Sequence, residues 1–175
     1  MDDFLLRLHQ GHVRSQCYAA LTAAELMDHF LGEGNSIAFW ASVQYLLTST
    51  ANISKSLWGQ SGKLRVEREP LRRSLEVPDD SPLEATDLRN DLEHIDERLD
   101  RWYARSTSHN YIDANIGPAG SIVGIARANI FRHYDPATGV VTFWGRDYSI
   151  PAIVEALNTL RPIVERESMK PHTGT

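Results

Sequence analysis

Three side chains that lie close together in the sequence, Arg89, Asn90 and His94, could act together on a phosphodiester. An arginine stays charged and presents a planar fork of donors that matches phosphate oxygens. A histidine titrates near neutral pH and can give or take a proton. Because RNA supplies its own 2′-hydroxyl nucleophile, metal-free cleavage needs only proton transfer and stabilisation of charge on the phosphate. We therefore expect Arg89 to bind the scissile phosphate, His94 to transfer the proton and Asn90, one helical turn away, to orient the imidazole.

The element that would position these side chains is a helix predicted over residues 81–103. Ser81 suits the N-cap, Pro82 suits the first helical position, and Glu84 completes a Ser-x-x-Glu capping box. Apolar residues then recur in alternating steps of four and three, which is typical of one buried seam. They are Leu88, Leu92, Ile95, Leu99 and Trp102.

The face opposite this seam carries a polar stripe of Asn90, His94, Glu97 and Arg101, with Arg89 on its flank. One protomer supplies only one histidine to the stripe. A two-fold axis beside the helix would bring two arginines and two histidines around one groove, and a symmetric dimer is the commonest oligomer. We expect a homodimer with an RNA substrate that Arg101 also contacts.

The spacing of an arginine and a histidine is a weak signal by itself. Arg7 and His12 repeat it, and Arg127 and His133 lie at a similar separation. The central pair differs from both because a polar residue follows its arginine and because it lies on the best-defined amphipathic helix of the chain. It is therefore the preferred catalytic candidate.

The composition is that of a folded globular protein. The chain has 175 residues, of which 42% are hydrophobic, and this is enough for one domain with a core. The single cysteine, Cys17, excludes an internal disulfide and a Cys-based zinc site and suits a reducing compartment. Neither a secretory signal nor a membrane-spanning run is visible, so we expect a soluble, cytoplasmic protein with no membrane partner.

The charge pattern leaves room for a local nucleic-acid site. A net charge of −5 argues against broad, charge-driven coating of nucleic acid. Basic residues crowd positions 63–73, whereas positions 79–100 are acidic, and the two stretches could pair with each other or face water. They could also form a patch that guides an RNA backbone toward the following helix, in which case Arg72 and Arg73 would contact the RNA.

Hydrophobic periodicity along the chain predicts a mainly α fold. Further helices are expected over residues 3–31, 36–58 and 63–75, before the helix over 81–103. Helices with one apolar face pack their seams inward. We therefore expect an antiparallel four-helix-type bundle over residues 1–110.

The remainder of the chain is expected to add β-structure and one more helix. Residues 121–134 and 140–144 are rich in β-branched and aromatic side chains and should form a β-hairpin around the turn at 135–139. A C-terminal helix then closes the fold. We expect the hairpin and this helix to form an appendage over residues 111–169 that packs on the bundle, followed by a disordered tail over 170–175.

The run Arg89–His94 resembles the signature of the HEPN family (higher eukaryotes and prokaryotes nucleotide-binding). That signature is an arginine, a polar residue directly after it and a histidine a few positions later. Residues 51–59 and 95–102 are also similar to uncharacterised bacterial members of such bundles. The resemblance covers residues 1–110.

The HEPN resemblance implies an antiparallel helical bundle that dimerises and often cleaves RNA without a metal. It implies that Arg89 and His94 are the catalytic pair, supported by Asn90. Many HEPN-type proteins are toxins, so the resemblance also implies a possible antitoxin partner or a role in defence.

Other interpretations of the same residues remain open. Arg89 with Glu93, and His94 with Glu97, are also spaced for ordinary surface ion pairs. Some HEPN-type proteins are non-catalytic modules that bind a protein or a nucleotide, and the acidity of the central helix favours that alternative. A metallo-hydrolase is the remaining option, but the Glu-x-x-His units of a di-iron bundle are missing, so we expect neither a metal nor a cofactor.

Overall fold

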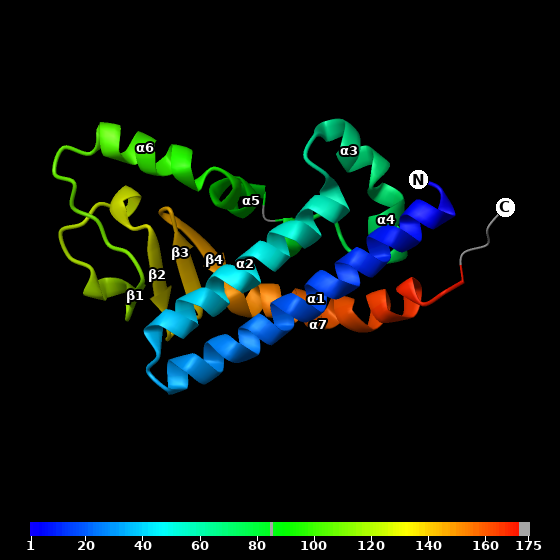
Figure 1. The fold of residues 1–175 in the computed structure, drawn as a ribbon, viewed down its shortest axis with the longest axis horizontal. Helices are drawn as coiled ribbons and strands as arrows, with labels where there is room; N and C mark the ends of the chain where they lie inside the picture. Colours follow the sequence, from blue (N-terminus) through cyan, green and yellow to red (C-terminus); the bar gives the residue numbers. More distant parts are fainter. Residues whose placement is uncertain (85, 172–175) are drawn as a thin grey trace. The chain divides into compact units, whose positions relative to one another are not determined.

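The computed structural model describes residues 1–84 and 86–171, and the side chains of Thr86, Arg89 and Glu93 lie outside its description. The fold is mainly helical, with a small four-stranded sheet and a C-terminal helix (Figure 1). This coarse architecture confirms the predicted mainly α class.

The chain forms two compact units, one of residues 1–89 and 153–175 and the other of residues 90–152. The predicted boundary lay at residue 110, with the last helix grouped with the hairpin. The observed division differs because most of that helix packs with the N-terminal helices. The second unit instead begins at residue 90, within the helix that was expected to complete the bundle.

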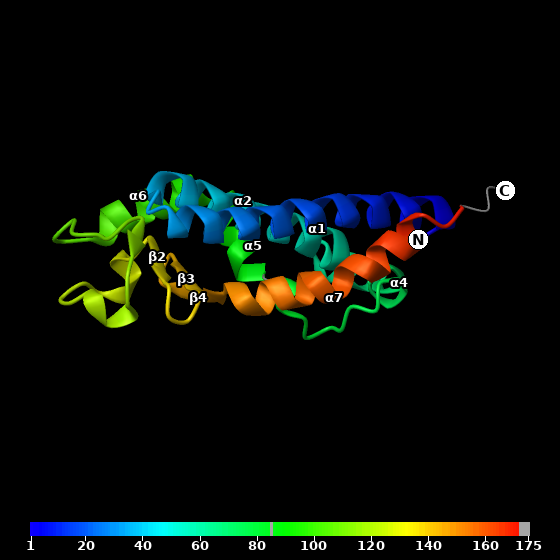
Figure 2. The ribbon, with the colours of Figure 1, turned by 90° about the horizontal axis from the view of Figure 1, so that it is seen from below.

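Two long helices, α1 (Asp3–Gly32) and α2 (Ser36–Trp58), lie side by side in the first unit (Figures 1 and 2). Each starts at a side-chain cap. Asp2 accepts a hydrogen bond from the amide of Leu5 at 2.8 Å, and Asn35 accepts one from the amide of Ala38 at 3.1 Å. Their facing sides bury a continuous apolar core, whose members include Val13, Cys17, Ala20, Phe39, Leu46 and Leu57.

The last helix, α7 (Ile150–Ser168), runs antiparallel to α1 over the part that belongs to this unit. The Arg7 guanidinium donates to the carbonyl of Glu167 at 2.7 Å, and the Cys17 thiol lies 3.5 Å from the carbonyl of Leu157. Burial raises the pKa of the Cys17 thiol to about 11. Cys17 is therefore a packing residue, as its place on an apolar helix face predicts.

Two short helices, α3 (Gly62–Glu67) and α4 (Glu69–Ser74), follow α2 where one helix over 63–75 was predicted. The 3₁₀ turn η1 (Pro82–Glu84) comes next, at the start of the helix predicted over 81–103. The helix predicted over 63–75 divides because Pro70 lacks an amide hydrogen and is tolerated only in the first turn of a helix. The sequence pattern is therefore helical throughout, but the chain turns at Arg68.

The long helix predicted over 81–103 is also divided, into α5 (Thr86–Glu93) and α6 (Ile95–Arg105). His94 lies between them with φ −119° and ψ 38°, which is outside the helical region. The predicted seam is buried only at its start. Leu88 is fully buried, whereas 44% of Ile95 and 43% of Leu99 are exposed.

The second unit contains a sheet with strand order β1-β2-β3-β4. Its strands are β1 (Asn115–Ile116), β2 (Arg132–Asp135), β3 (Val140–Phe143) and β4 (Arg146–Ser149). β1 pairs with β2 in parallel, and the other pairs are antiparallel. The predicted hairpin and its turn at 135–139 are thus confirmed by β2 and β3, while β1 and β4 were not predicted.

The predicted strand over 121–134 is much shorter in the structure. Only its last residues join β2, and two 3₁₀ turns, η2 (Ala119–Ser121) and η3 (Arg127–Asn129), occupy the segment before it. Gly124 has φ 78° and 86% of Val123 is exposed, so this segment neither extends nor buries its apolar side chains.

The β3–β4 connection is a two-residue turn formed by Trp144 and Gly145, which have φ 50° and 75°. Positive φ at both positions is the type I′ geometry that matches the twist of a tight hairpin. A side chain at Gly145 would come within 2.9 Å of the carbonyl of Arg127, so glycine is required there. A tryptophan is an unusual residue in the left-handed region, and the hairpin holds it there.

Within the described ranges, no helix is long and apolar enough to cross a membrane. The described helices instead follow the amphipathic pattern of elements that bury one face.

Candidate nucleic-acid interface

The predicted catalytic histidine, His94, lies at the junction of α5 and α6 with an exposed side chain. Its Nδ1 is 3.4 Å from Oε1 of Glu97, which matches the ordinary surface contact considered as an alternative. Asn90 is exposed on α5. The side chain of Arg89 falls outside the described residues, so the predicted Arg89–His94 pair stays a prediction.

One face of α6 gathers positive charge in steps of three and four residues. Its members are Arg98, Arg101 and Arg105, and His94 directly precedes the helix. At about 100° per residue these positions span a narrow sector of the helix. The predicted stripe contained His94 and Arg101, so the structure retains Arg101 on this face and adds two arginines that the sequence analysis did not select.

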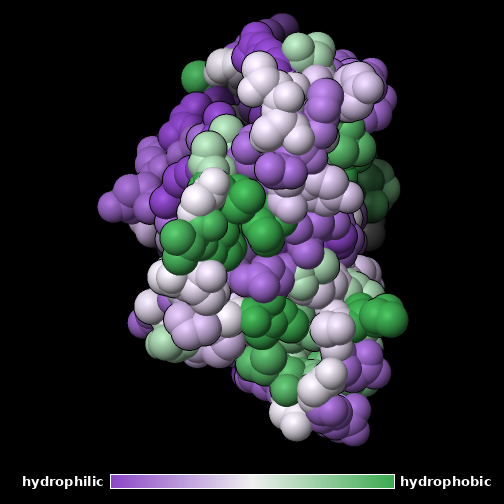
Figure 3. Space-filling view, turned by 90° about the vertical axis from the view of Figure 1, so that its left-hand side faces the viewer, coloured by the Kyte–Doolittle hydropathy of each residue, from purple (hydrophilic) through white to green (hydrophobic). Residues whose placement is uncertain are grey.

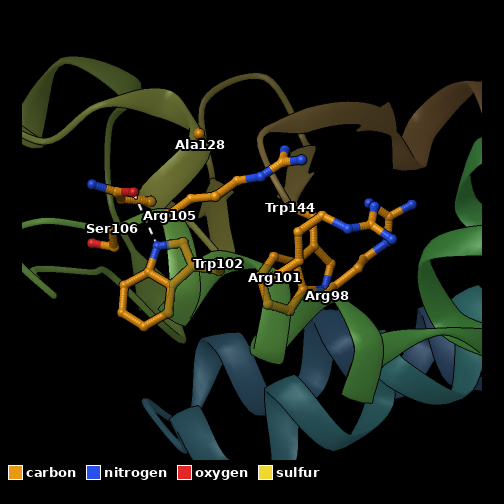
Figure 4. Close-up of a pocket in the computed structure, with 8 residues that line it drawn as sticks. Arg98, Arg101, Trp102, Arg105, Ser106, Ala128 and Trp144 are labelled. Atoms are coloured by element: carbon orange, nitrogen blue, oxygen red, sulfur yellow. Dashed lines mark hydrogen bonds between the residues drawn. The ribbon is translucent and has the colours of Figure 1, made fainter.

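The three arginines line a pocket of about 370 Å³ (Figure 4). Trp102, which also comes from α6, and Trp144 of the β3–β4 turn supply its aromatic lining. In Figure 4 the arginine side chains extend to one side of the pocket, with the Trp144 indole beside Arg98 and Arg101, whereas the Trp102 indole lies apart from the guanidinium groups. All of these residues belong to the second unit.

Arg98 is fixed by a buried carboxylate, Asp91 of α5, with which it forms an ion pair. The Arg146 guanidinium and the Tyr148 hydroxyl, both of β4, also approach the Asp91 carboxylate at 3.4 Å. A buried carboxylate is stable only when charged or polar partners compensate for its lost hydration. This cluster therefore joins α5, α6 and β4 and sets the position of the first arginine in the pocket.

Arg101 and Arg105 differ from Arg98 because both are exposed and neither forms an ion pair or side-chain hydrogen bond among the described residues. They lie four residues apart on the helix, where like charges repel by a few tenths of a kcal/mol. Two unneutralised guanidinium groups beside a cavity create a positive local potential on a chain whose net charge is −5. The pocket is therefore suited to an anion.

The two indoles in the pocket are held by an aromatic cluster. Trp102 donates from Nε1 to Oδ1 of Asn129 at 3.0 Å, and its ring packs edge-on against Phe131 with centroids 4.9 Å apart. Trp144 lies on the same Phe131 at 4.3 Å. The Trp144 Nε1 is buried and has no hydrogen-bond partner among the described atoms. Its strained backbone and unsatisfied donor are features that concentrate at functional sites.

The basic stretch predicted to guide RNA is occupied by structural contacts. Only 5% of Arg72 is exposed, and its guanidinium donates to the carbonyl of Leu57 at 2.7 Å and pairs with Asp79 at 2.9 Å. The Arg72 side chain is therefore buried in a hydrogen-bond network, and its predicted contact with RNA stays a prediction. Arg73 is exposed but forms an ion pair with Glu69 on its own helix.

The spacing of Arg98, Arg101 and Arg105 is visible in the sequence and could have revealed this face. Trp144 had no such signal, because the tight turn that presents it lacks the Asn-Gly or Asp-Gly residues typical of type I′ hairpins. Sequence reasoning therefore found one of the three pocket arginines and neither of the unusual turn residues.

Among the described residues, no group of three or more His, Cys, Asp or Glu side chains is arranged to hold a metal ion. Comparisons of the chain with models of protein families, with curated protein sequences and with solved structures find no match. The geometry of the pocket is therefore the basis on which its function is considered.

Proposed function

We propose that this chain is an RNA-binding protein and that the arginine face of α6, together with Trp102 and Trp144, contacts the RNA. The observation that carries this proposal is the placement of Arg101 and Arg105, without ion-pair partners among the described residues, around a pocket that contains two indoles. Guanidinium groups bind phosphates, and aromatic rings stack on bases. Bases are available for stacking only where they are unpaired, so the proposed ligand is single-stranded.

The test is the affinity of the purified protein for a short, fluorescently labelled single-stranded RNA, measured by anisotropy. Replacing Arg101 and Arg105 together by Glu should weaken binding by about tenfold or more, because two phosphate contacts become repulsive. The matched control is Arg161→Glu with Arg166→Glu, which makes the same change in net charge on exposed residues of α7. Equal loss in both double variants would overturn the proposal.

The salt dependence of binding gives a second readout. Each phosphate contact with a single strand adds about −0.7 to the slope of log affinity against log salt. Removing both arginines should therefore flatten the slope by about 1.4, whereas the control pair should leave it unchanged. A merely structural effect of the substitutions would lower affinity at all salt concentrations without changing the slope.

Metal-independent RNA cleavage is the second candidate function, favoured by the place of His94 directly before α6, the helix that carries the arginines. An imidazole at the end of a phosphate-binding face could transfer a proton during attack of the 2′-hydroxyl. This is the HEPN-type proposal, with Arg89 as its partner and Asn90 as support. It predicts cleavage in excess EDTA that is lost in His94→Ala and in Arg89→Ala. If the protein binds RNA but does not cleave it, the alternative of a non-catalytic binding module is favoured.

A homodimer is part of the HEPN-type proposal, as is an antitoxin partner. Ile95, Leu99 and Tyr103 recur every four residues along α6 and are 44%, 43% and 67% exposed, so they offer apolar area that a dimer could bury. Figure 3 shows separate hydrophobic patches between hydrophilic residues on the face that it views. Sedimentation equilibrium of wild type and of Leu99→Glu tests this, since the substitution should favour the monomer.

A further inference from the structure

A second polar site crosses the sheet of the same unit. Asn115, His133, Thr142 and Asp147 are successive cross-strand partners on β1, β2, β3 and β4. Cross-strand partners project from the same side of a sheet. The register therefore builds one row of polar side chains across all four strands.

The buried member of this row, His133, has one ring nitrogen without a partner. Only 4% of the residue is exposed, and Asn115 Nδ2 lies 2.8 Å from His133 Nδ1. Because an amide nitrogen is a donor, Nδ1 is the acceptor and Nε2 carries the ring proton. Nε2 is buried and has no hydrogen-bond partner in the described part of the chain. Such a donor requires an acceptor to offset its lost hydration.

The other end of the row is already satisfied. Asp147 accepts a hydrogen bond from the Thr142 hydroxyl at 2.7 Å and pairs with the Arg127 guanidinium at 2.6 Å. Burial alone would raise the pKa of Asp147, but the hydrogen bonds from Arg127 and Thr142, together with nearby positive charge, hold that pKa below its usual value. Asp147 is therefore an ionised carboxylate that lines the site, and it does not donate a proton.

A second carboxylate, Asp135, lies two residues beyond His133 on β2 and so shares its face. Only 8% of Asp135 is exposed, and its Oδ1 accepts from the amide of Ala137 at 2.9 Å. A carboxylate has several acceptor sites, so Asp135 can still accept from a ligand. His133 and Asp135 thus offer a donor and an acceptor on one face of the sheet, and both line the same cavity.

These side chains line a cavity of about 250 Å³, with Ile122, Ile130 and Val140 among its apolar walls. Its volume lies below the usual range of about 300–1,000 Å³ for sites of drug-sized ligands, so it suits a smaller planar ring. The cavity has its own lining and shares no residue with the arginine pocket. The segment η3 contributes to both, through Arg127 here and through Ala128 and Asn129 there.

We propose that this cavity binds a planar heterocycle with a carbonyl beside a ring N–H, the edge that uracil and guanine present. The carbonyl oxygen accepts from His133 Nε2, the adjacent ring N–H donates to Asp135, and the isoleucines and the valine pack on the ring faces. Cytosine and adenine present the opposite polarity at the corresponding ring nitrogen and are rejected, because Asp135 would then face a second acceptor. The proposal stands apart from RNA binding by α6.

The experiment titrates the full chain with uridine, guanosine, cytidine and adenosine, followed by calorimetry and by the ring proton signals of His133. Uridine and guanosine should bind at least about tenfold more tightly than the other two. Asp135→Asn keeps the shape and the Ala137 contact but adds a donor, so it should weaken uridine binding by about tenfold or more. Asp96→Asn, an exposed carboxylate of α6, is the matched control.

Equal affinity for the four nucleosides, no binding of any, or uridine binding unchanged in Asp135→Asn would each overturn the proposal. His133→Phe removes the ring donor to the carbonyl and should weaken uridine binding by about tenfold or more, which gives an independent variant if Asp135→Asn fails to fold. The ring could belong to a free nucleoside or to a base within an RNA strand. The two are distinguished by comparing the binding of uridine and of a short oligouridylate to the Arg101→Glu, Arg105→Glu double variant. Uridine binding that survives there separates this site from the α6 interface.

Discussion

The helix pair α1–α2 and the helix α6 each carry apolar residues at helical spacing, yet these residues are buried to very different extents. Residues on the facing sides of α1 and α2, such as Val13 and Leu57, are fully buried. On α6, Ile95 and Leu99 are nearly half exposed, and the charged face includes two arginines without a partner among the described residues. This difference indicates that α1 and α2 form the scaffold of the protein, whereas the exposed side chains of α6 can contact other molecules.

The largest expected effect separates a leucine on each helix. Leu57→Ala should lower the free energy of unfolding by about 3 kcal/mol, because it leaves a cavity in a closely packed core. Leu99→Ala should lower it by about 0.5 kcal/mol or less, because the side chain is already partly hydrated. Urea unfolding followed by circular dichroism measures both. Similar losses for the two variants would show that α6 is as tightly packed as α2.

The second effect concerns the ion pair between Asp91 and Arg98, which positions α6 instead of a buried apolar face. Asp91→Ala removes the buried carboxylate and leaves Arg98 without its partner, so we expect a loss of about 2 kcal/mol in unfolding free energy. The exposed Asp96 on α6 is the control, and Asp96→Ala should change stability by about 0.5 kcal/mol or less. If both variants were equally stable, the ion-pair cluster would have no role in positioning α6.

Much of the scaffold could be predicted from the sequence, because local patterns determine it. The apolar faces of α1, α2 and α7 and the turn at 135–139 all have signals within a few residues. The break at His94 had no such signal, since the seam continues in register across it from Leu88 to Trp102. Whether a seam is buried depends on what packs against it, and a single sequence does not contain that information.

The candidate site was less predictable for the same reason. Arg72 and Arg101 are both arginines on predicted helices. In the structure Arg72 donates a hydrogen bond to a carbonyl of α2, whereas Arg101 lines a pocket. The β3–β4 turn was missed because Trp144 adopts a backbone conformation that tryptophan rarely takes. Contacts between distant segments decide these outcomes, so spacing along the chain identified Arg101 and His94 but not their surroundings.

The third effect tests how closely α1 is packed, through the titration of Cys17. Burial raises the pKa of this thiol to about 11, above the value of 9.0 for an exposed thiol. The folded state thus favours the neutral thiol, so the contribution of Cys17 to stability is complete below pH 9.0 and is lost as the pH rises toward about 11. The difference in stability between wild type and Cys17→Ala should shrink by about 1–2 kcal/mol over that interval.

The measurement is the unfolding free energy of both proteins at closely spaced alkaline pH values. Subtracting the two curves cancels lysine and tyrosine titrations that they share. A constant difference between the curves would mean that the thiol is hydrated and that α1 opens at this position.

The smallest effect is the change in unfolding free energy when one arginine of each unit is replaced. We expect this change to have opposite signs in the two units. Arg73 on α4 pairs with Glu69 one turn earlier, so Arg73→Gln should lower stability by about 0.3 kcal/mol. Arg101 on α6 has Arg98 and Arg105 as its helical neighbours, and Glu97 is contacted by His94 at 3.4 Å. Arg101→Gln relieves this repulsion and should raise stability by about 0.3 kcal/mol while weakening RNA binding. A gain in stability that accompanies a loss of binding is the behaviour expected of a functional face, whereas a loss of both would show that Arg101 supports the fold.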